Sequence, residues 1–245
     1  MGSSVRTVLL VHDDAAMRYY LGMLLMRLQY VVLTATTPEE AIKSAEQTTP
    51  FVVLTMAPRL NGTDLLRTLK ASARTSAVPV IVLADEDNAE VRSSFRSMGY
   101  AACLVNPVAP HELYRAIQAE TETMPRAHIR LNLSLKAVMG SEGALGGGEP
   151  AAYTSTISEG GCYLRTNSPQ PKNTLTLLKI FIKDREVRIK AQVLRHDRHG
   201  RTASREGGMG MKFIEIPDSD RIFLRNFITE QLTYDMPGGF RSGSS

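Results

Sequence analysis

The spacing of apolar residues changes near residue 125, and each side of that point predicts its own architecture. Before it, apolar runs of strand length alternate with segments whose apolar residues recur every three or four positions. The runs occupy 7–11, 31–35, 51–54, 79–83 and 102–105, and the helical segments occupy 15–28, 38 onward, 63–73, 88–98 and 111–122. This order predicts an α/β fold, a doubly wound five-stranded parallel sheet with helices on both faces.

After residue 125 the apolar positions alternate with a period of two, which is typical of half-buried strands. Every second residue from Ile129 to Val138 is apolar or small, and further strand-like runs lie at 152–157, 162–166, 174–182, 187–196 and 208–215. Six short strands separated by Gly and Pro turns predict an all-β domain, a closed antiparallel barrel. We expect a last helix at 218–232 to plug it, with an apolar stripe formed by Ile222, Phe223, Phe227, Ile228 and Leu232.

The two patterns predict domains at 1–122 and 123–236, a flexible Gly-rich loop at 140–150 and a disordered tail at 237–245. No apolar run reaches the ~18 residues of a membrane-spanning helix. The first residues lack the apolar segment of a signal peptide. Two widely spaced cysteines give neither a disulfide framework nor a metal-ligand spacing. We therefore expect a cytoplasmic protein without membrane insertion.

Charge is distributed unevenly between the two halves. Residues 1–125 carry 11 Lys and Arg against 13 Asp and Glu, whereas residues 126–245 carry 18 against 12. The second half is therefore the part expected to meet an anion. Where the two patterns meet, Arg126 and Arg130 stand four residues apart. Their guanidinium groups can clamp a doubly negative ligand through planar donor pairs, and the alternative is two solvated arginines in a linker.

Four motifs lie at the ends of the predicted parallel strands: Val8-Leu-Leu-Val-His-Asp-Asp14, Pro58-Arg-Leu-Asn-Gly62, Val78-Pro-Val-Ile-Val-Leu83 and Leu104-Val-Asn-Pro107. Together they resemble a response-regulator receiver domain over about half of the chain. The resemblance implies a phosphorylation site with an acidic pair for Mg²⁺, a phosphoacceptor Asp ending the third strand, a Ser or Thr, and a Lys. It also implies a cis peptide bond at Asn106-Pro107.

The residues at those positions depart from the receiver pattern. His12 stands in place of the first acid while Asp13 remains, and no Asp or Glu occurs from 51 to 57, so Leu54 or Thr55 replaces the acceptor. Ala84 stands at the hydroxyl position and Asn106 at the lysine position. An aspartyl phosphate needs a carboxylate nucleophile and neutralisation of the transferring phosphoryl group. We therefore expect a pseudo-receiver that cannot be phosphorylated and binds no metal.

A domain without phosphotransfer can still bind a protein partner or a second copy of the chain. The helix after Pro110 is the first candidate for such a surface. Asp13 and Asp14 alone make a poor Mg²⁺ site, because Mg²⁺ requires near-octahedral oxygen coordination. We expect them to have structural or solvated roles, and His12 to be a hydrogen-bonded residue at a strand end.

The second half resembles a PilZ domain, a bacterial module that binds cyclic di-GMP. The resemblance rests on Arg126-x-x-x-Arg130, on the run from Ser155 to Thr166, and on Gly207-Gly-Met-Gly-Met-Lys-Phe-Ile-Glu-Ile216. In that family two arginines clamp the phosphates and guanine faces, and an (Asp/Asn)-x-Ser-x-x-Gly turn completes the pocket. The resemblance therefore implies a cyclic di-GMP site formed by Arg126, Arg130, Thr156, Ser158 and Gly161.

Thr156 departs from this pattern, because the family has an acid or amide there. A hydroxyl is a shorter and weaker acceptor than a carboxylate and cannot grip two donors, but the phosphate clamp is intact, so we expect weakened or altered binding rather than none. His128, between the two arginines, is expected on the outward face of the first strand. The arginines between 185 and 201 predict a basic hairpin that is solvated or contacts phosphate or an acidic partner.

The sequence features bear on four candidate functions. The first is a non-catalytic effector that binds cyclic di-GMP and relays it to a protein partner. The second is a nucleotide-independent scaffold in localisation, motility or polarity control. A nucleic-acid binder has the basic half in its favour but no recognised DNA-reading motif and few aromatics for stacking. An enzyme is the least supported, because neither half contains a nucleophile–base constellation.

Overall fold

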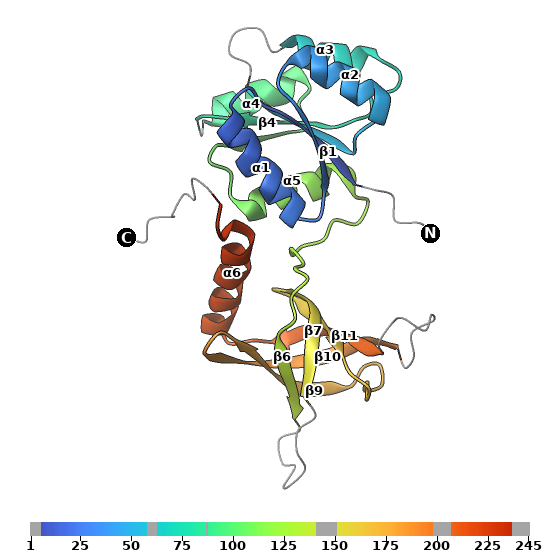
Figure 1. Ribbon diagram of the computed structural model, residues 1–245, viewed down its shortest axis with the longest axis vertical. Helices are drawn as coiled ribbons and strands as arrows, with labels where there is room; N and C mark the ends of the chain where they lie inside the picture. Colours follow the sequence, from blue (N-terminus) through green and yellow to red (C-terminus); the bar gives the residue numbers. More distant parts are fainter. Residues whose placement is uncertain (1–5, 58–62, 87, 141–150, 198–206, 237–245) are drawn as a thin grey trace. The chain divides into compact units, whose positions relative to one another are not determined.

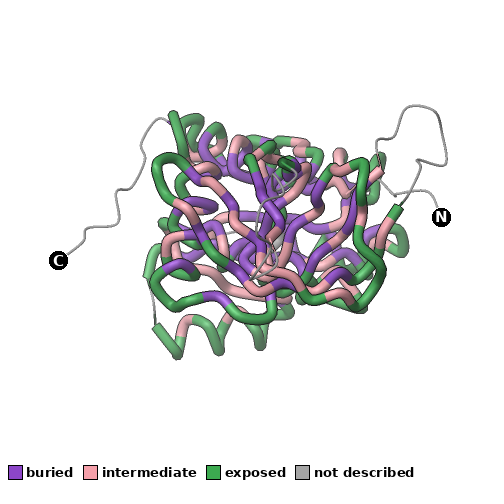
Figure 2. Tube along the Cα trace, turned by 90° about the horizontal axis from the view of Figure 1, so that it is seen from below, coloured by how far each residue is buried: buried purple, intermediate pink, exposed green. Residues whose placement is uncertain are grey.

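A computed structural model describes residues 6–57, 63–86, 88–140, 151–197 and 207–236 (Figure 1). The chain divides into two compact units, Met1–Ala127 with Gln231–Ser245, and His128–Glu230. Residues 141–150 of the predicted loop, the tail at 237–245 and the Pro58–Gly62 motif lie outside the described residues, and Gly140, the first residue of that loop as predicted, ends a strand. Buried positions, purple in Figure 2, follow the inner strands, and exposed positions follow the outer helix faces and turns.

The first unit contains the predicted five-stranded parallel sheet, with strand order β2-β1-β3-β4-β5. Its strands are β1 (Thr7–Val11), β2 (Val31–Ala35), β3 (Val52–Met56), β4 (Val80–Ala84) and β5 (Ala102–Val105). Its helices are α1 (Ala15–Arg27), α2 (Pro38–Thr48), α3 (Thr63–Ala71), α4 (Ala89–Met98) and α5 (Pro110–Thr121). The α/β prediction is confirmed.

Burial on both faces explains why the parallel strands are continuously apolar. Every residue of β4 is buried, as expected for a strand covered by helices on both sides. On one face, a core cluster joins β1, β3 and β4 to α2 and α3, and Figure 1 draws α1 and α5 on the other. The Asn106-Pro107 peptide bond is cis, as predicted.

Helix starts in this unit follow the sequence signals. Asp14 caps α1 by accepting from the Met17 amide at 2.7 Å. Thr37 caps α2 by accepting from the Glu40 amide, and Pro38 occupies the first turn. A side-chain oxygen at this position satisfies one of the amide donors left without a partner at a helix start.

The second unit contains a closed six-stranded barrel with strand order β10-β11-β8-β7-β6-β9. Its strands are β6 (Lys136–Gly140), β7 (Ala151–Ser158), β8 (Gly161–Arg165), β9 (Leu175–Ile182), β10 (Arg185–Asp197) and β11 (Gly208–Glu215). The helix α6 (Asp218–Thr233) follows. In β10 the apolar side chains at 187, 189, 191 and 193 are all buried. The predicted barrel with a C-terminal helix is confirmed.

The strand predicted from 129 to 138 is interrupted. Leu131 forms an isolated antiparallel bridge with Ile157, and β6 begins only at Lys136. Between them, the buried Thr154 hydroxyl donates to the Leu133 carbonyl and accepts from the Leu135 amide. A side chain thus replaces part of the backbone ladder, which periodicity alone cannot reveal.

The buried stripe of α6 also differs from the predicted one. Ile222 is 58% exposed, and Leu224 is fully buried together with Ile228 and Leu232. Leu224, Ile228 and Leu232 follow one another at i, i+4 and i+8, which defines one helix face, and Ile222 lies off it. Phe223 is partly buried beneath the Arg185 guanidinium, 4.7 Å from its ring centre.

Candidate functional sites

Residues of the expected receiver site meet at the carboxyl edge of the parallel sheet. His12 and Asp13 directly follow β1, and Asn106 follows β5. Ala84 is the last residue of β4 and pairs with Val105, while Thr55 in β3 pairs with Val11. Because parallel strands end at one edge, these side chains share one region of the sheet, as the motif order predicted.

The groups at this edge are mostly buried or engaged in local structure. Leu54 is fully buried, and Thr55 is 8% exposed. The Arg18 guanidinium donates to the His12 carbonyl at 2.6 Å and to the Asp13 carbonyl at 3.1 Å. The described residues contain no group of three or more His, Cys, Asp and Glu side chains placed to hold a metal ion.

His12 is a buried strand-end residue, as expected. Its Nδ1 accepts from the Asp14 amide at 3.0 Å, and it is 7% exposed. Within the described part of the chain, its buried Nε2 has no hydrogen-bond partner. Burial lowers the pKa of the His12 imidazole below its ordinary value, against the opposing effect of Asp13. The backbone amide of Met17 lowers the pKa of the Asp14 carboxyl, which fits its role as the helix cap.

In the barrel, the segment that contains Arg130 lies along the end of β7. The Leu131 amide donates to the Ile157 carbonyl at 2.9 Å, and the Ile157 amide donates back to Leu131 at 2.9 Å. In such a mutually bonded antiparallel pair, the residues on either side form close non-bonded pairs. Arg130 is therefore opposite Ser158, and four of the five predicted binding residues, Arg130, Thr156, Ser158 and Gly161, belong to one region.

The turn from β7 to β8 is closed by its own side chain. The Ser158 hydroxyl donates to the Gly161 carbonyl at 3.0 Å, and the two residues pair in the ladder. A Cβ at Gly161 would stand 2.3 Å from the Met211 carbonyl oxygen of β11. Gly161 therefore permits a close approach between β8 and β11.

Two residues of this turn that the motif leaves unspecified make specific contacts. Glu159 is 5% exposed and accepts from the Arg225 Nε of α6 at 2.9 Å. A Cβ at Gly160 would stand 2.7 Å from His128 Cδ2. The His128 ring thus lies against the turn and is partly buried rather than outward-facing. The acidic residue and the Gly-Gly pair in the sequence were the only signals for these contacts.

Arg126 belongs to the first unit. Its backbone amide donates to the buried Gln118 side-chain oxygen at 3.1 Å, and Gln118 in turn donates to the Tyr30 hydroxyl at 3.3 Å. The side chain of Arg126 is exposed. One arginine of the predicted pair is thus held by α5, and the other lies in the barrel unit.

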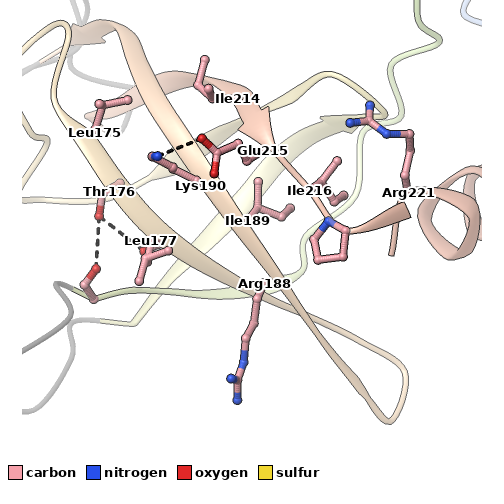
Figure 3. A pocket seen from close by; sticks show the side chains of 12 residues that line it. Leu175, Thr176, Leu177, Arg188, Ile189, Lys190, Ile214, Glu215, Ile216 and Arg221 are labelled. Atoms are coloured by element: carbon pink, nitrogen blue, oxygen red, sulfur yellow. Dashed lines mark hydrogen bonds and ion pairs between the residues drawn. The ribbon is translucent and has the colours of Figure 1, made fainter. Parts of the chain in front are cut away.

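An open groove of about 940 Å³ lies elsewhere on the barrel and contains none of the predicted site residues (Figure 3). Leu175, Leu177 and Ile214 form its apolar part, and Lys190 is paired with Glu215 at 2.8 Å. Arg188, which points away from this pair in Figure 3, binds Glu186 at 2.6 Å. The nearby Arg185 pairs with Asp220. Arg185 and Arg188 of the predicted basic hairpin are therefore paired with acids, and its residues 198–201 lie outside the described residues.

Comparison with known proteins assigns a family to each half. Residues 8–118 match the response regulator receiver domain, and residues 125–230 match the PilZ domain. The chain is 32% identical over 114 residues to Protein PilH of Pseudomonas aeruginosa, covering 46% of this chain and 94% of PilH.

In two further matches, the chain spans only about half of the matched protein's length. The chain is 29% identical over 134 residues to a probable transcriptional regulator, ycf27, of Guillardia theta, covering 54% of this chain but only 52% of that protein. Among solved structures, the Bacillus subtilis inhibitor of motility MotI/DgrA has 20% identity and a TM-score of 0.38, covering 45% of this chain and 53% of that one. A similarity at that level supports no inference about function.

The chain belongs to the response-regulator receiver family, and a PilZ domain follows its receiver domain. Receiver and PilZ domains are signalling modules, and PilZ domains form a cyclic di-GMP-binding family. No helix in the described ranges is both long and apolar enough to cross a membrane.

Proposed function

We propose that this protein is a non-catalytic effector that binds cyclic di-GMP through its PilZ domain and relays it to a protein partner. The observation that carries the proposal is the antiparallel alignment of Arg130 with Ser158 at the Thr156–Gly161 turn, fixed by the Leu131–Ile157 bridge. Arg126, Arg130, Thr156, Ser158 and Gly161 are the proposed binding residues.

Each proposed residue has a chemical role toward a cyclic dinucleotide. Arg130 and Arg126 pair with phosphate oxygens and stack on guanine faces, since guanidinium groups do both. Ser158 presents a hydroxyl at the turn, and both arginines are exposed. Thr156 stands where the family has an acid or an amide. The charge-assisted hydrogen bond that a carboxylate would make there is worth on the order of 1.5–3 kcal/mol. That loss corresponds to a roughly ten- to hundredfold weaker affinity, which leaves binding measurable.

The receiver domain, in this proposal, takes no phosphoryl group. The fully buried Leu54 and the buried Thr55 support this view, since neither is a carboxylate nucleophile. Ala84 and Asn106 supply neither the hydroxyl nor the cation of a working site. The domain instead provides a surface for a cytoplasmic protein partner or for a homodimer, with α5 as the first candidate.

Calorimetric titration of the full chain with cyclic di-GMP tests the proposal. We expect saturable binding near micromolar ligand that Arg126→Ala and Arg130→Ala each abolish. Arg188→Ala is the matched control, since it removes an exposed arginine of the same barrel outside the proposed site. Absence of saturable binding, or binding that survives Arg130→Ala, contradicts the proposal.

Thr156 is the observation that favours a second function, a nucleotide-independent scaffold in localisation, motility or polarity control. In that case the two domains act only as interaction surfaces. Affinity purification with and without cyclic di-GMP distinguishes the two functions. The scaffold function is supported if the same proteins co-purify with and without cyclic di-GMP and also with Arg130→Ala.

A further inference from the structure

We propose that Asn132 reads the base edge of the bound nucleotide and supplies the amide that Thr156 lacks. This inference rests on the proposed nucleotide function and names a base-contacting residue outside the five proposed above. It places the base-reading group on the neighbouring segment, one position after Leu131, rather than on β7.

The register of the Leu131–Ile157 bridge places Asn132 opposite Thr156. The two residues of the bridge exchange amide–carbonyl bonds of 2.9 Å in both directions. Counting one residue outward pairs Asn132 with Thr156 on one side and Arg130 with Ser158 on the other. The contact of the His128 ring with Gly160 fits the same register, because 128 and 160 are each three residues from the bridge.

Directly opposed residues in a non-hydrogen-bonded antiparallel pair are the closest neighbours that a sheet offers. Their Cβ atoms lie about 4.5–5.5 Å apart on the same face. An amide at position 132 can therefore reach the space that a longer side chain at position 156 would occupy. Asn132 is exposed and Thr156 partly exposed, so this space opens to a ligand.

Arg130, Asn132, Thr156 and Ser158 form a block of four polar side chains, and only one of them has the groups to read a base edge at two points. A guanidinium has donors and no acceptor, and a hydroxyl has its one donor and its acceptor lone pairs on a single atom. The Ser158 hydroxyl already donates to the Gly161 carbonyl. The Asn132 amide has a carbonyl acceptor beside two N–H donors, which matches adjacent donor and acceptor atoms of a purine edge. On guanine, the carbonyl accepts from N1–H while the amide donates to O6.

Titrations of cyclic di-GMP and cyclic di-AMP into Asn132 variants test this assignment. We expect Asn132→Ala to weaken cyclic di-GMP binding roughly five- to thirtyfold, the effect of one or two lost hydrogen bonds. Because a terminal amide can turn over and pair with the adenine edge too, the variant should weaken cyclic di-AMP binding as well. Asn132→Asp should retain cyclic di-GMP binding, because a carboxylate accepts from N1–H and N2–H together.

A cross-strand exchange provides the sharpest test. Adding Thr156→Asp to Asn132→Ala should restore the affinity for cyclic di-GMP more than that for cyclic di-AMP, because a carboxylate on the opposite strand accepts from guanine N1–H and N2–H together. Asn167→Ala removes an exposed amide beyond the other end of β8 and should change neither quantity. Thermal unfolding should not change in Asn132→Ala, since an exposed side chain is removed.

The possible outcomes separate the two proposals. If the wild-type chain binds cyclic di-GMP and Arg130→Ala abolishes binding, but Asn132→Ala stays within twofold in affinity for both cyclic dinucleotides, the assignment to Asn132 is wrong and the proposed function stands. Failure of Thr156→Asp to restore the double variant also overturns it. If the wild-type chain binds no cyclic dinucleotide, both proposals fail together.

Discussion

The backbone brings the expected site positions together both at the carboxyl edge of the receiver sheet and at the turn from β7 to β8 in the barrel. The side chains at the two places differ. At the sheet edge, the phosphoacceptor position is filled by Leu54 or Thr55, both buried. At the barrel turn, Ser158 and Arg130 keep the polar groups, and their alignment is fixed by backbone hydrogen bonds. A fold therefore preserves the location of a site independently of its chemistry, and each site has to be judged from its side chains.

Returning a carboxylate to the receiver edge should have the largest effect on stability and none on phosphorylation. Leu54→Asp places an acid at a fully buried position, which should cost on the order of 3–5 kcal/mol as an uncompensated buried charge. Chemical denaturation measures the loss, and incubation with acetyl phosphate measures phosphorylation. Leu54→Asn is the uncharged control. Phosphate incorporation by Leu54→Asp would show that the remaining residues suffice and would remove the contrast between the two sites.

Two glycine-to-alanine variants compare how well each unit tolerates an added methyl group. In Gly161→Ala, the new Cβ would stand 2.3 Å from the Met211 carbonyl oxygen, and because backbone cannot move aside we expect a loss of about 2–3 kcal/mol. Gly22→Ala in α1 meets nothing within 4 Å and should stabilise its unit by about 0.5–1 kcal/mol. Hydrogen exchange of β8 and α1 amides reports each effect separately. Equal responses would show that strand proximity at Gly161 is unimportant.

Disturbing the His128–Gly160 contact should have a smaller effect. The size of that effect should depend on which residue occupies position 128. In Gly160→Ala, the three nearest atoms to the new Cβ all belong to the His128 ring, which can rotate away. The displaced ring should loosen the Arg130 segment and reduce cyclic di-GMP affinity several-fold. His128→Ala removes the clash, so the double variant should be no weaker than His128→Ala alone. A double variant in which the two losses add would contradict direct contact, since independent sites are additive.

The smallest expected effect is a pH dependence confined to the receiver unit. Burial lowers the pKa of folded His12 from the ordinary value of 6.5. Below pH 6.5 the unfolded chain binds a proton that the folded chain does not. The stabilisation is therefore present above that pH and is lost as the pH falls, by at most about 1.4 kcal/mol per pH unit. Hydrogen exchange of β1 amides between pH 5 and pH 8 measures it. His12→Asn should flatten the profile, and an unchanged slope would show that His12 is not its source.

The sequence by itself determined the two architectures, because both patterns report burial directly. Buried parallel strands must be continuously apolar, as β4 is, and strands with one face inward must alternate, as β10 does. The departures from the receiver motif were also visible, since the chemical type of a residue at a strand end needs no coordinates. The roles of the five predicted nucleotide-binding residues stay predictions.

Only the tertiary structure decided which residues oppose one another. Thr154 bonds two backbone groups where the predicted strand at 129–138 is interrupted, and the separate Leu131–Ile157 bridge aligns Arg130 with Ser158 and Asn132 with Thr156. The ion pair of the buried Glu159 with the exposed Arg225, and the His128–Gly160 contact, likewise join residues that are 66 and 32 positions apart. The periodicity of apolar residues indicates which positions are buried. It does not identify the residue opposite on the next strand, because the register is set by the closure of the whole barrel.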